Sequence, residues 1–400
     1  MPSQTRDAAI VGIHEYPLRR IEELSSLQIK AECAIRALQD AGLAWKDVDA
    51  VYECGEGGGV LSGIPSTPEY FGVEVGVTDT TMVGGSSFEF QAAHAKRAIA
   101  AGKARVALLT YGSTLRRDGA RLGAGGRSFA GDVAHPVSNL EEFWGLTLAG
   151  DYAMVAQRHM HDFGTTSDQL AEISVATRLH ATRNPQAVRA MTDLAFQGTG
   201  ELTVEDVVAS RLIADPLHLL DCCMISDGGG AAVIAAAEVA RDCRQPPVWL
   251  LGGGEAVKSP ENGGDITVTA AARSGPSAFG EAGVRPDEID LCLLYDSFTI
   301  TVLTVLEDLG LCRKGEGGSF VQGGRLRFDS PEKPALNTDG GGLSSNHPGM
   351  RGLFLLIEAT RQLRGQSTSQ VEGARLAVAS GLGGRLGSRH SAGTIVLAKD

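Results

Sequence analysis

Hydrophobic and polar positions follow two spacings along the chain, and the order of these spacings predicts strands that alternate with helices. Residues 8–13 form a short continuous apolar run, which is typical of a buried strand. Residues 21–42 then carry apolar side chains at helical spacing and stop at a glycine, where many helices end. Strand-like runs at 47–54 and 104–113 enclose a glycine turn and a helical pattern in 80–102. This order predicts an α/β fold with a mostly parallel sheet covered by helices.

The same order of patterns recurs in the second half of the chain. Residues 37–55 align with residues 278–297, and residues 104–113 align with residues 374–383. In each half, a glycine turn and an apolar helix lie between the two matching segments. Chance seldom produces two matches in the same order, so we expect two similar α/β halves.

A proline break near residue 245 divides the two halves. We therefore predict an N-terminal half of residues 1–245 and a C-terminal half of residues 246–400. Residues 114 to about 212 have no counterpart in the second half, so we interpret them as an insert. The insert begins with a basic, glycine-rich run at 115–129 and continues with two helical patterns. Inserts of this length usually serve substrate binding or subunit contacts.

Composition and charge exclude several classes of protein. The 400 residues carry a net charge of −12 and no long basic run, which argues against nucleic acid and anionic membranes as partners. The apolar runs are too short to span a bilayer and no leader pattern is present, so we expect a cytoplasmic protein that does not bind membranes. The seven cysteines form no CxxC pair, so we expect neither a disulfide framework nor a metal site.

Four segments carry longer patterns: residues 151–185, residues 215–238 (DPLHLLDCCMISDGGGAAVIAAAE), residues 294–299 (LYDSFT) and residues 337–352 (NTDGGGLSSNHPGMRG). Together they resemble the sterol-carrier-type, thiolase-like (lipid-transfer) branch of the thiolase superfamily. The resemblance covers nearly the whole chain. It implies a thiolase fold, in which two duplicated βαβαβ-type halves form a layered α/β/α/β/α core, and it implies at least a homodimer.

The two cysteines that the resemblance leads us to expect are missing. The nucleophilic cysteine of thiolases falls at Gly85, or at Ser86 with a one-residue slip. The second cysteine falls at Ser380 or Gly381. A thiolate attacks thioesters and accepts the acyl group near neutral pH, and a serine hydroxyl without a base partner does neither well. We therefore do not expect ordinary thiolysis.

Other parts of the family pattern are retained or replaced. The histidine of the Gly-His-Pro segment is present as His347, and Tyr295 replaces the asparagine of the Asn-Glu-Ala-Phe motif. Some members of this branch are aldolases of steroid side-chain degradation that use tyrosine chemistry and a small OB-fold/zinc-ribbon partner protein. The resemblance thus implies an acyl-CoA carbon–carbon lyase that cleaves a β-hydroxyacyl-CoA, with a steroid side-chain ester as one candidate. Two alternatives remain open: a thiolase-like acyltransferase or condensing enzyme, and a non-catalytic acyl-CoA or lipid carrier.

The candidate site lies in the two glycine turns and the replaced motif. The catalytic candidates are Tyr295, His347 and Ser345. Tyr295 would act as acid/base or orient the substrate hydroxyl, and His347 would donate to the enolate oxygen. We expect the neighbouring Asp296 to cap the helix predicted at 298–310. The substrate-binding candidates are Ser86, Ser87, Gly340, Gly341, Gly342 and Asn346. We expect no metal and no cofactor, because the CoA thioester is itself the substrate.

Overall fold

The computed structural model describes residues 6–54, 65–119, 145–259, 264–387 and 389–400. The first half contributes β1 (Ala8–Glu15), α1 (Ser26–Ala41), β2 (Ala50–Glu53), α2 (Ser66–Phe71), β3 (Val77–Asp79), α3 (Ser87–Ala100), β4 (Val106–Ser113) and β7 (Gly228–Ala236). The second half contributes β8 (Val248–Lys258), α10 (Ala271–Ala282), β9 (Leu291–Leu294), α11 (Thr299–Asp308), α12 (Gly317–Phe320), β10 (Ala335–Leu336), α13 (Gly341–Ser344), α14 (Gly352–Arg364), β11 (Leu376–Arg385) and β12 (Arg389–Ala398).

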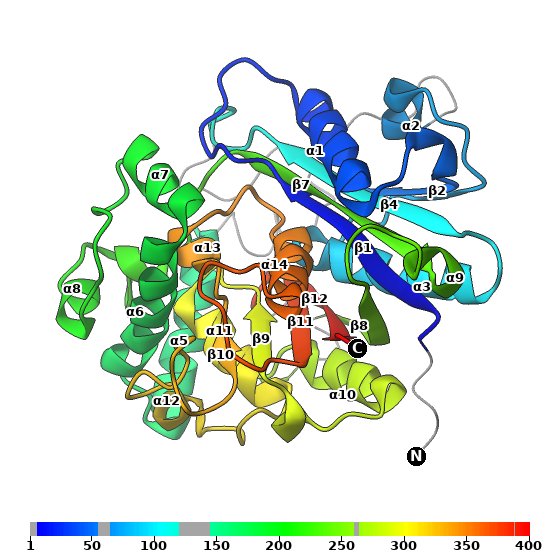
Figure 1. Cartoon of the computed structure of the whole chain (residues 1–400). Coiled ribbons are helices and arrows are strands. Elements are labelled where there is room, and N and C mark those ends of the chain that lie inside the picture. Colours follow the sequence, from blue (N-terminus) through cyan, green and yellow to red (C-terminus); the bar gives the residue numbers. More distant parts are fainter. Residues whose placement is uncertain (1–5, 55–64, 120–144, 260–263, 388) are drawn as a thin grey trace.

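The remaining elements lie between β4 and β8. They are α5 (Leu148–Phe163), α6 (Ser167–Arg183), α7 (Pro185–Asp193), α8 (Val204–Val208), β5 (Leu212–Ala214), β6 (Leu217–His218) and α9 (Ala237–Ala240). The helices α5 to α8 belong to the predicted insert. Of these, α5 and α6 pack against α11, α6 also packs against α13, and α7 and α8 pack on α6 (Figure 1). Most of the basic run at 115–129 lies outside the described residues.

The strand order shows the duplication directly. Ten strands of the described chain form one sheet, in the order β10-β9-β11-β12-β8-β1-β7-β4-β2-β3. Each half of the sheet therefore has the same internal order, and the antiparallel pair of β1 with β8 joins the two halves. The helices α1 and α10 both end at a left-handed glycine, Gly42 and Gly283, before a short turn and a strand. These are the segments that the sequence alignment matched.

The sheet is mixed, so the prediction of a mostly parallel sheet is wrong. The strands β3, β2 and β4 are parallel, as are β10, β9 and β11. The strands β7 and β12 run antiparallel to their neighbours in both halves. The sequence interpretation did not include β7 or β12 among its strands. Only three residues separate β11 from β12, and so short a connection produces an antiparallel pair.

The layers follow the predicted α/β/α/β/α order, which is confirmed. The helix α1 covers the outer face of the first half-sheet, and α10 covers the outer face of the second. The helices α3 and α14 contact each other and strands of both half-sheets, so they form the central layer (Figure 1). Small residues set the spacing of the layers: a Cβ atom at Gly254 would lie 2.0 Å from the carbonyl oxygen of Ser274 on α10.

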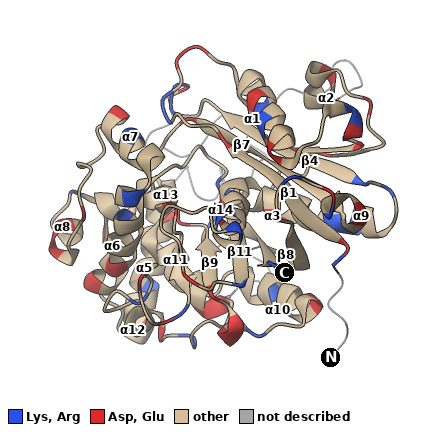
Figure 2. Cartoon of the chain, in the orientation of Figure 1, with Lys and Arg blue, Asp and Glu red and all other residues tan. Residues whose placement is uncertain are grey.

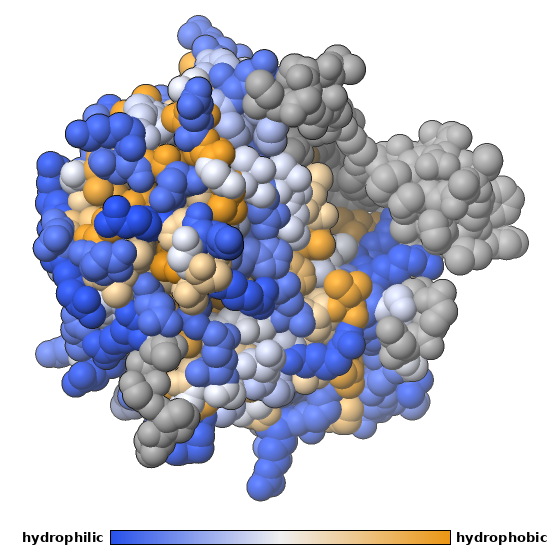
Figure 3. Space-filling view, turned by 90° about the vertical axis from the view of Figure 1, so that its right-hand side faces the viewer, coloured by the Kyte–Doolittle hydropathy of each residue, from blue (hydrophilic) through white to orange (hydrophobic). Residues whose placement is uncertain are grey.

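The surface carries both signs of charge. Figure 2 shows basic and acidic residues interspersed along most elements. On the face shown in Figure 3, hydrophobic residues are broken up by hydrophilic ones. Among the described residues, no helix combines the length and the apolar character that crossing a membrane requires.

Candidate active site

The two glycine turns that the sequence pairs lie at the amino ends of the two central helices. A single 3₁₀ turn, Gly84–Ser86, leads into α3, and the short helix α13 precedes α14. Tyr295 directly follows β9, which is hydrogen-bonded to β11 in the sheet. The fold therefore brings residues from both halves of the chain to one place in the central layer.

Tyr295 fills the space beside Gly85. A Cβ atom built on Gly85 would lie 2.1 Å from Cε2 and 2.2 Å from Cζ of Tyr295, and 2.4 Å from the carbonyl oxygen of Leu382. Real Cβ atoms do not approach other heavy atoms this closely, so no side chain fits at residue 85 while the tyrosine ring stays in place. The ring occupies the volume that a nucleophilic side chain at residue 85 would need.

Tyr295 and His347 lie against each other. Their rings meet edge to face, with centroids 5.4 Å apart and an interplanar angle of 77°. The Tyr295 hydroxyl donates a hydrogen bond of 3.0 Å to the carbonyl oxygen of Gly349. Burial raises the pKa of Tyr295 well above its usual value, so the side chain is a phenol that keeps its proton. It is therefore a hydrogen-bond donor and not a ready base.

The imidazole of His347 is neutral. Burial and then the nearby charge of Arg351 lower the pKa of His347 to about 4. Its Nε2 atom is buried and has no hydrogen-bond partner among the described residues. The buried hydroxyl of Ser345 also lacks a partner there. Buried polar atoms are nearly always hydrogen-bonded, so two orphaned groups two residues apart indicate a place where a ligand or water binds.

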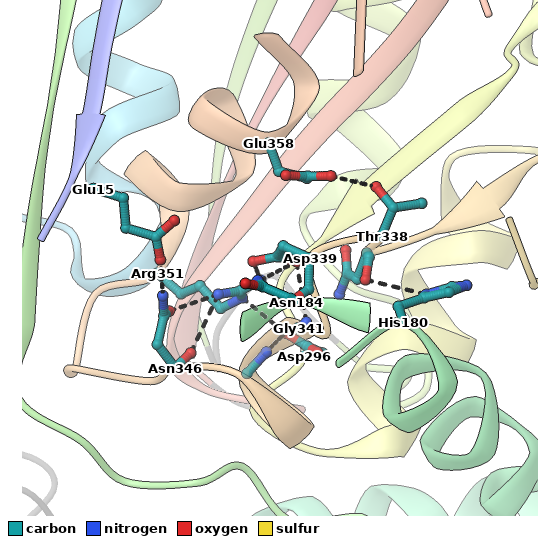
Figure 4. A network of polar contacts seen from close by, with 12 residues as sticks. Glu15, His180, Asn184, Asp296, Thr338, Asp339, Gly341, Asn346, Arg351 and Glu358 are labelled. Atoms are coloured by element: carbon teal, nitrogen blue, oxygen red, sulfur yellow. Dashed lines mark hydrogen bonds and ion pairs between the residues drawn. The ribbon is translucent and has the colours of Figure 1, made fainter. Parts of the chain in front are cut away.

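A buried ionic network holds the turn that carries these groups (Figure 4). Arg351 donates to both carboxylate oxygens of Asp339, at 2.8 and 2.6 Å, and its Nε lies 3.2 Å from Oδ1 of Asp296. It also donates to Oδ1 of Asn346 at 2.6 Å. The amide of Asn346 in turn donates to Glu15 on β1 at 2.5 Å. Both ends of the Asn346 side chain are thus engaged inside the protein, and its contact with substrate stays a prediction.

The amides of the second glycine turn are occupied by protein groups. Gly341 N donates to Asp339 at 3.0 Å, Gly342 N donates to Asp296 at 2.8 Å, and Gly340 N donates to a backbone carbonyl. A Cβ atom at Gly341 would lie 2.0 Å from Oδ2 of Asp296, so glycine is needed to admit this carboxylate. The contact of these glycines with a substrate thioester remains a prediction.

Asp296 does not cap the helix that follows it, so that expectation is wrong. Its carboxylate accepts from the amides of Gly342 and Leu343 and therefore caps α13. The residue before α11, Phe298, provides no side-chain cap. The guanidinium of Arg351 pairs with the Asp296 carboxylate and stabilises it in this position at α13.

The two serines of the first glycine turn hold that turn in shape. The Ser86 hydroxyl lies 2.7 Å from the Ser391 hydroxyl on β12. The Ser87 hydroxyl accepts from Val83 N at 2.9 Å and donates to Gly84 O at 2.7 Å. Both side chains are buried. Their predicted contact with substrate stays a prediction.

One buried group near these turns was missed by the sequence interpretation. Glu89, in the first turn of α3, is fully buried, and neither of its carboxylate oxygens has a partner among the described residues. The available signal was an acidic residue inside the apolar pattern SFEFQAA. Helical spacing alone does not distinguish such a residue from one that faces solvent.

Comparisons with known proteins agree with this architecture. Residues 254–399 match a family described as "Thiolase C-terminal domain-like". The chain is 31% identical to an acetyl-CoA acetyltransferase of Methanothermobacter thermautotrophicus, over 96% of this chain and 98% of that protein. It is 32% identical to a steroid side-chain-cleaving aldolase of Thermomonospora curvata, over 91% and 92%. The solved structure "Ltp2-ChsH2(DUF35) aldolase" superposes with a TM-score of 0.84 and 29% identity, over 99% of both chains. The chain therefore belongs to the thiolase superfamily.

Proposed function

We propose that the protein is an acyl-CoA carbon–carbon lyase that cleaves a β-hydroxyacyl-CoA by a retro-aldol reaction. The observation that carries this proposal is the contact between Gly85 and Tyr295. An acyltransferase of this fold needs a nucleophile that takes up the acyl group. At residue 85 the tyrosine ring leaves no room for one. A retro-aldol cleavage forms no acyl-enzyme, so it needs no nucleophile.

The other candidate nucleophiles are poorly suited to acyl transfer. Burial raises the pKa of Cys223 to about 12 and raises the pKa of Cys222 as well, so neither is a thiolate near neutral pH. Ser86 lies against another serine hydroxyl, and that contact supplies no base. The relationship to an acetyl-CoA acetyltransferase keeps acyl transfer as the second candidate, which the experiment below separates from cleavage.

The polar groups of the site suit the two charges that a retro-aldol step creates. The β-hydroxyl loses its proton, the Cα–Cβ bond breaks, and its electron pair moves through Cα to the thioester oxygen. The Tyr295 phenol keeps its proton and would turn its O–H from the carbonyl oxygen of Gly349 to that enolate oxygen, while the unpartnered Nε2 of the neutral His347 imidazole would accept the hydroxyl proton. The sequence-based expectation gave the donor's role to His347. The retained phenol proton of Tyr295 and the unpartnered Nε2 of His347 favour this opposite assignment.

The relatives supply the proposed substrate and partners. One relative is named a steroid side-chain-cleaving aldolase, so we propose a CoA ester of a steroid side chain as substrate. The superposed aldolase structure contains a DUF35 protein, so we propose a hetero-complex with an OB-fold/zinc-ribbon partner of that type. A homodimer and a cytoplasmic location are parts of the same proposal.

The test is a product analysis on the complex with its DUF35-type partner. The complex is incubated with β-hydroxyacyl-CoA esters, and the products are identified by mass spectrometry. A ketone or aldehyde plus a shorter acyl-CoA is the expected result. Turnover of a 3-ketoacyl-CoA that requires free CoA, without cleavage of any β-hydroxyacyl-CoA, would contradict the proposal and favour acyl transfer.

Two variants locate the chemistry. Tyr295→Phe removes only the phenol hydroxyl, and the loss of one donor to the enolate is expected to lower kcat by about 10²–10³-fold. Tyr70→Phe is the matched control, because the Tyr70 side chain is 51% exposed and should not affect kcat. Equal activity of the two variants would remove Tyr295 from the mechanism.

A further inference from the structure

Glu89 is a buried carboxyl group that the network around Arg351 does not use. It lies in the first turn of α3, three residues after Ser86, and is fully buried. Neither carboxylate oxygen has a hydrogen-bond partner among the described residues. Leaving a polar group buried and unpaired destabilises the folded protein. A group kept at such a cost requires an explanation in the function of the site.

Three glycines from three other elements make room for the side chain of Glu89, and two of them face its carboxyl group. A Cβ atom at Gly381 on β11 would lie 2.1 Å from Oε2 of Glu89, and one at Gly352 on α14 would lie 2.4 Å from it. A Cβ atom at Gly393 on β12 would lie 2.6 Å from the Cβ of Glu89. Any side chain at Gly381 or Gly352 would displace the carboxyl group, so the surrounding backbone is shaped to hold it.

The carboxyl group lies next to the candidate site. The same Cβ position at Gly352 that meets Oε2 of Glu89 would lie 2.5 Å from the carbonyl oxygen of Gly85. Gly85 is the residue packed against the ring of Tyr295. Gly381, which faces Glu89, is also one of the two positions where the family resemblance places the second missing cysteine. The carboxyl group of Glu89 therefore lies near Gly85, the residue that packs against the tyrosine ring.

Glu89 also differs in protonation from the other carboxyl group near the site. Burial raises the pKa of Glu89 to about 8, and no positive side chain opposes this shift, so the group carries a proton at pH 7. Asp296 instead pairs with Arg351 and accepts from the amide of Gly342. Of these two acids, only Glu89 holds a proton that is not bound to a partner.

We propose that Glu89 is the acid that delivers a proton to the α-carbon of the enolate left by carbon–carbon cleavage. This inference rests on the proposed function and extends it to the second proton transfer. The O–H bond of Glu89 breaks, a C–H bond forms at Cα, and the charge moves from the enolate to the carboxylate. The proton taken from the β-hydroxyl, or one from solvent, then restores the acid. No oxidant, reductant or further reactant is needed.

The reverse of this step can be measured without any cleavage. In D₂O, the Glu89 carboxylate should abstract an α-proton from acetyl-CoA or propionyl-CoA, and mass spectrometry should detect deuterium in the acyl group. The exchange rate should rise with pH up to about the pKa of Glu89. Glu89→Gln should lower exchange and lyase turnover by at least about 10²-fold, the contribution typical of general acid–base catalysis. Glu89→Asp, which keeps an acid one methylene shorter, should recover part of both.

Glu358→Gln is the matched control. Glu358 is also buried and carries a raised pKa of about 7, but it accepts from Thr338 and Ser367 on the other side of α14. Its variant should exchange at the wild-type rate, which separates a chemical role of Glu89 from a general effect of neutralising a buried acid. Melting curves of each variant establish that the protein is folded at the assay temperature.

The outcomes separate this inference from the proposed function. If the wild-type complex cleaves β-hydroxyacyl-CoA and Glu89→Gln both cleaves and exchanges normally, Glu89 is not the proton donor and the lyase assignment stands. If exchange depends on Glu89 but the complex never cleaves, the lyase assignment fails and the proton transfer stands. If Glu89→Gln and Glu358→Gln are impaired equally, the role of Glu89 is structural and the inference is overturned.

Discussion

One added methyl group at residue 85 tests whether Tyr295 occupies the place of the missing nucleophile. In Gly85→Ala the new Cβ would start 2.1 Å from the tyrosine ring and 2.4 Å from the carbonyl oxygen of Leu382. Carbon atoms normally stay about 3.5–4.0 Å apart, so the ring and the strand must move by more than about 1 Å. Overpacking costs about 1–3 kcal/mol, and because backbone lies on one side of the methyl group we expect the upper end of this range.

Removal of the Tyr295 ring should lower the overpacking cost of the methyl group at residue 85. Tyr295→Ala alone should lose about 3–5 kcal/mol, as for other large buried aromatic residues. In the double variant, the methyl group at residue 85 enters the space that the ring leaves, and only the contact with Leu382 remains. The double variant should therefore be more stable than the sum of the two single effects by about 1–2 kcal/mol.

The measurement is the free energy of unfolding in urea, followed by circular dichroism, for the two single variants and the double variant. Gly280→Ala is the control, because no atom lies within 4 Å of a Cβ atom built there on α10. That variant should be neutral or more stable by up to about 1 kcal/mol, since alanine favours helix. Effects of Gly85→Ala and Tyr295→Ala that add within about 0.5 kcal/mol would refute the steric reasoning.

Three further predictions follow from the second glycine turn. Arg351→Met leaves the carboxylates of Asp339 and Asp296 buried without their cation and should cost about 3–5 kcal/mol of unfolding free energy, whereas Arg285→Met, which removes an exposed ion pair, should leave the unfolding free energy nearly unchanged. His347 has a pKa lowered to about 4, so the unfolded chain binds its proton first and His347→Gln should reduce the loss of stability between pH 6.5 and pH 4. Lyase activity of the wild type should likewise show no titration of His347 near pH 6.5. Ser345→Ala removes a hydroxyl that has no partner among the described residues, so the free energy of unfolding should stay unchanged. A fall in kcat/KM of this variant would show that the hydroxyl contacts the substrate.

The duplicated architecture could be predicted because it depends on local signals. The helix-ending glycines Gly42 and Gly283 and the strand-like runs after them sit at equivalent places in the sheet. The direction of β7 and β12 could not be read in the same way, because an apolar run does not show which neighbour it pairs with. The prediction of a mostly parallel sheet failed for this reason.

The candidate site was predictable to the level of segments and not of contacts. The turn that holds Ser345 and His347 was found from its motif, and the fold brings Tyr295 beside it. The polar groups of this turn have hydrogen-bond and ion-pair partners that lie far away in the sequence. Asp296 accepts from the amide of Gly342 and pairs with Arg351. The spacing of these residues in the sequence does not predict that they meet.

Gly85 and Gly381 are two of the positions where the family resemblance places the missing cysteines, and both are approached by side chains from the opposite half of this chain. Tyr295, in the C-terminal half, packs onto Gly85 in the N-terminal half, and Glu89, in the N-terminal half, packs onto Gly381 in the C-terminal half. At each of these glycines, a larger polar side chain occupies the volume that a side chain there would need. A cysteine returned to residue 85 alone would collide with the ring, so recovery of acyl transfer requires the removal of Tyr295 in the same variant. A side chain at residue 85 and the ring of Tyr295 therefore exclude each other, and this exclusion favours chemistry on an enolate over chemistry through an acyl-enzyme.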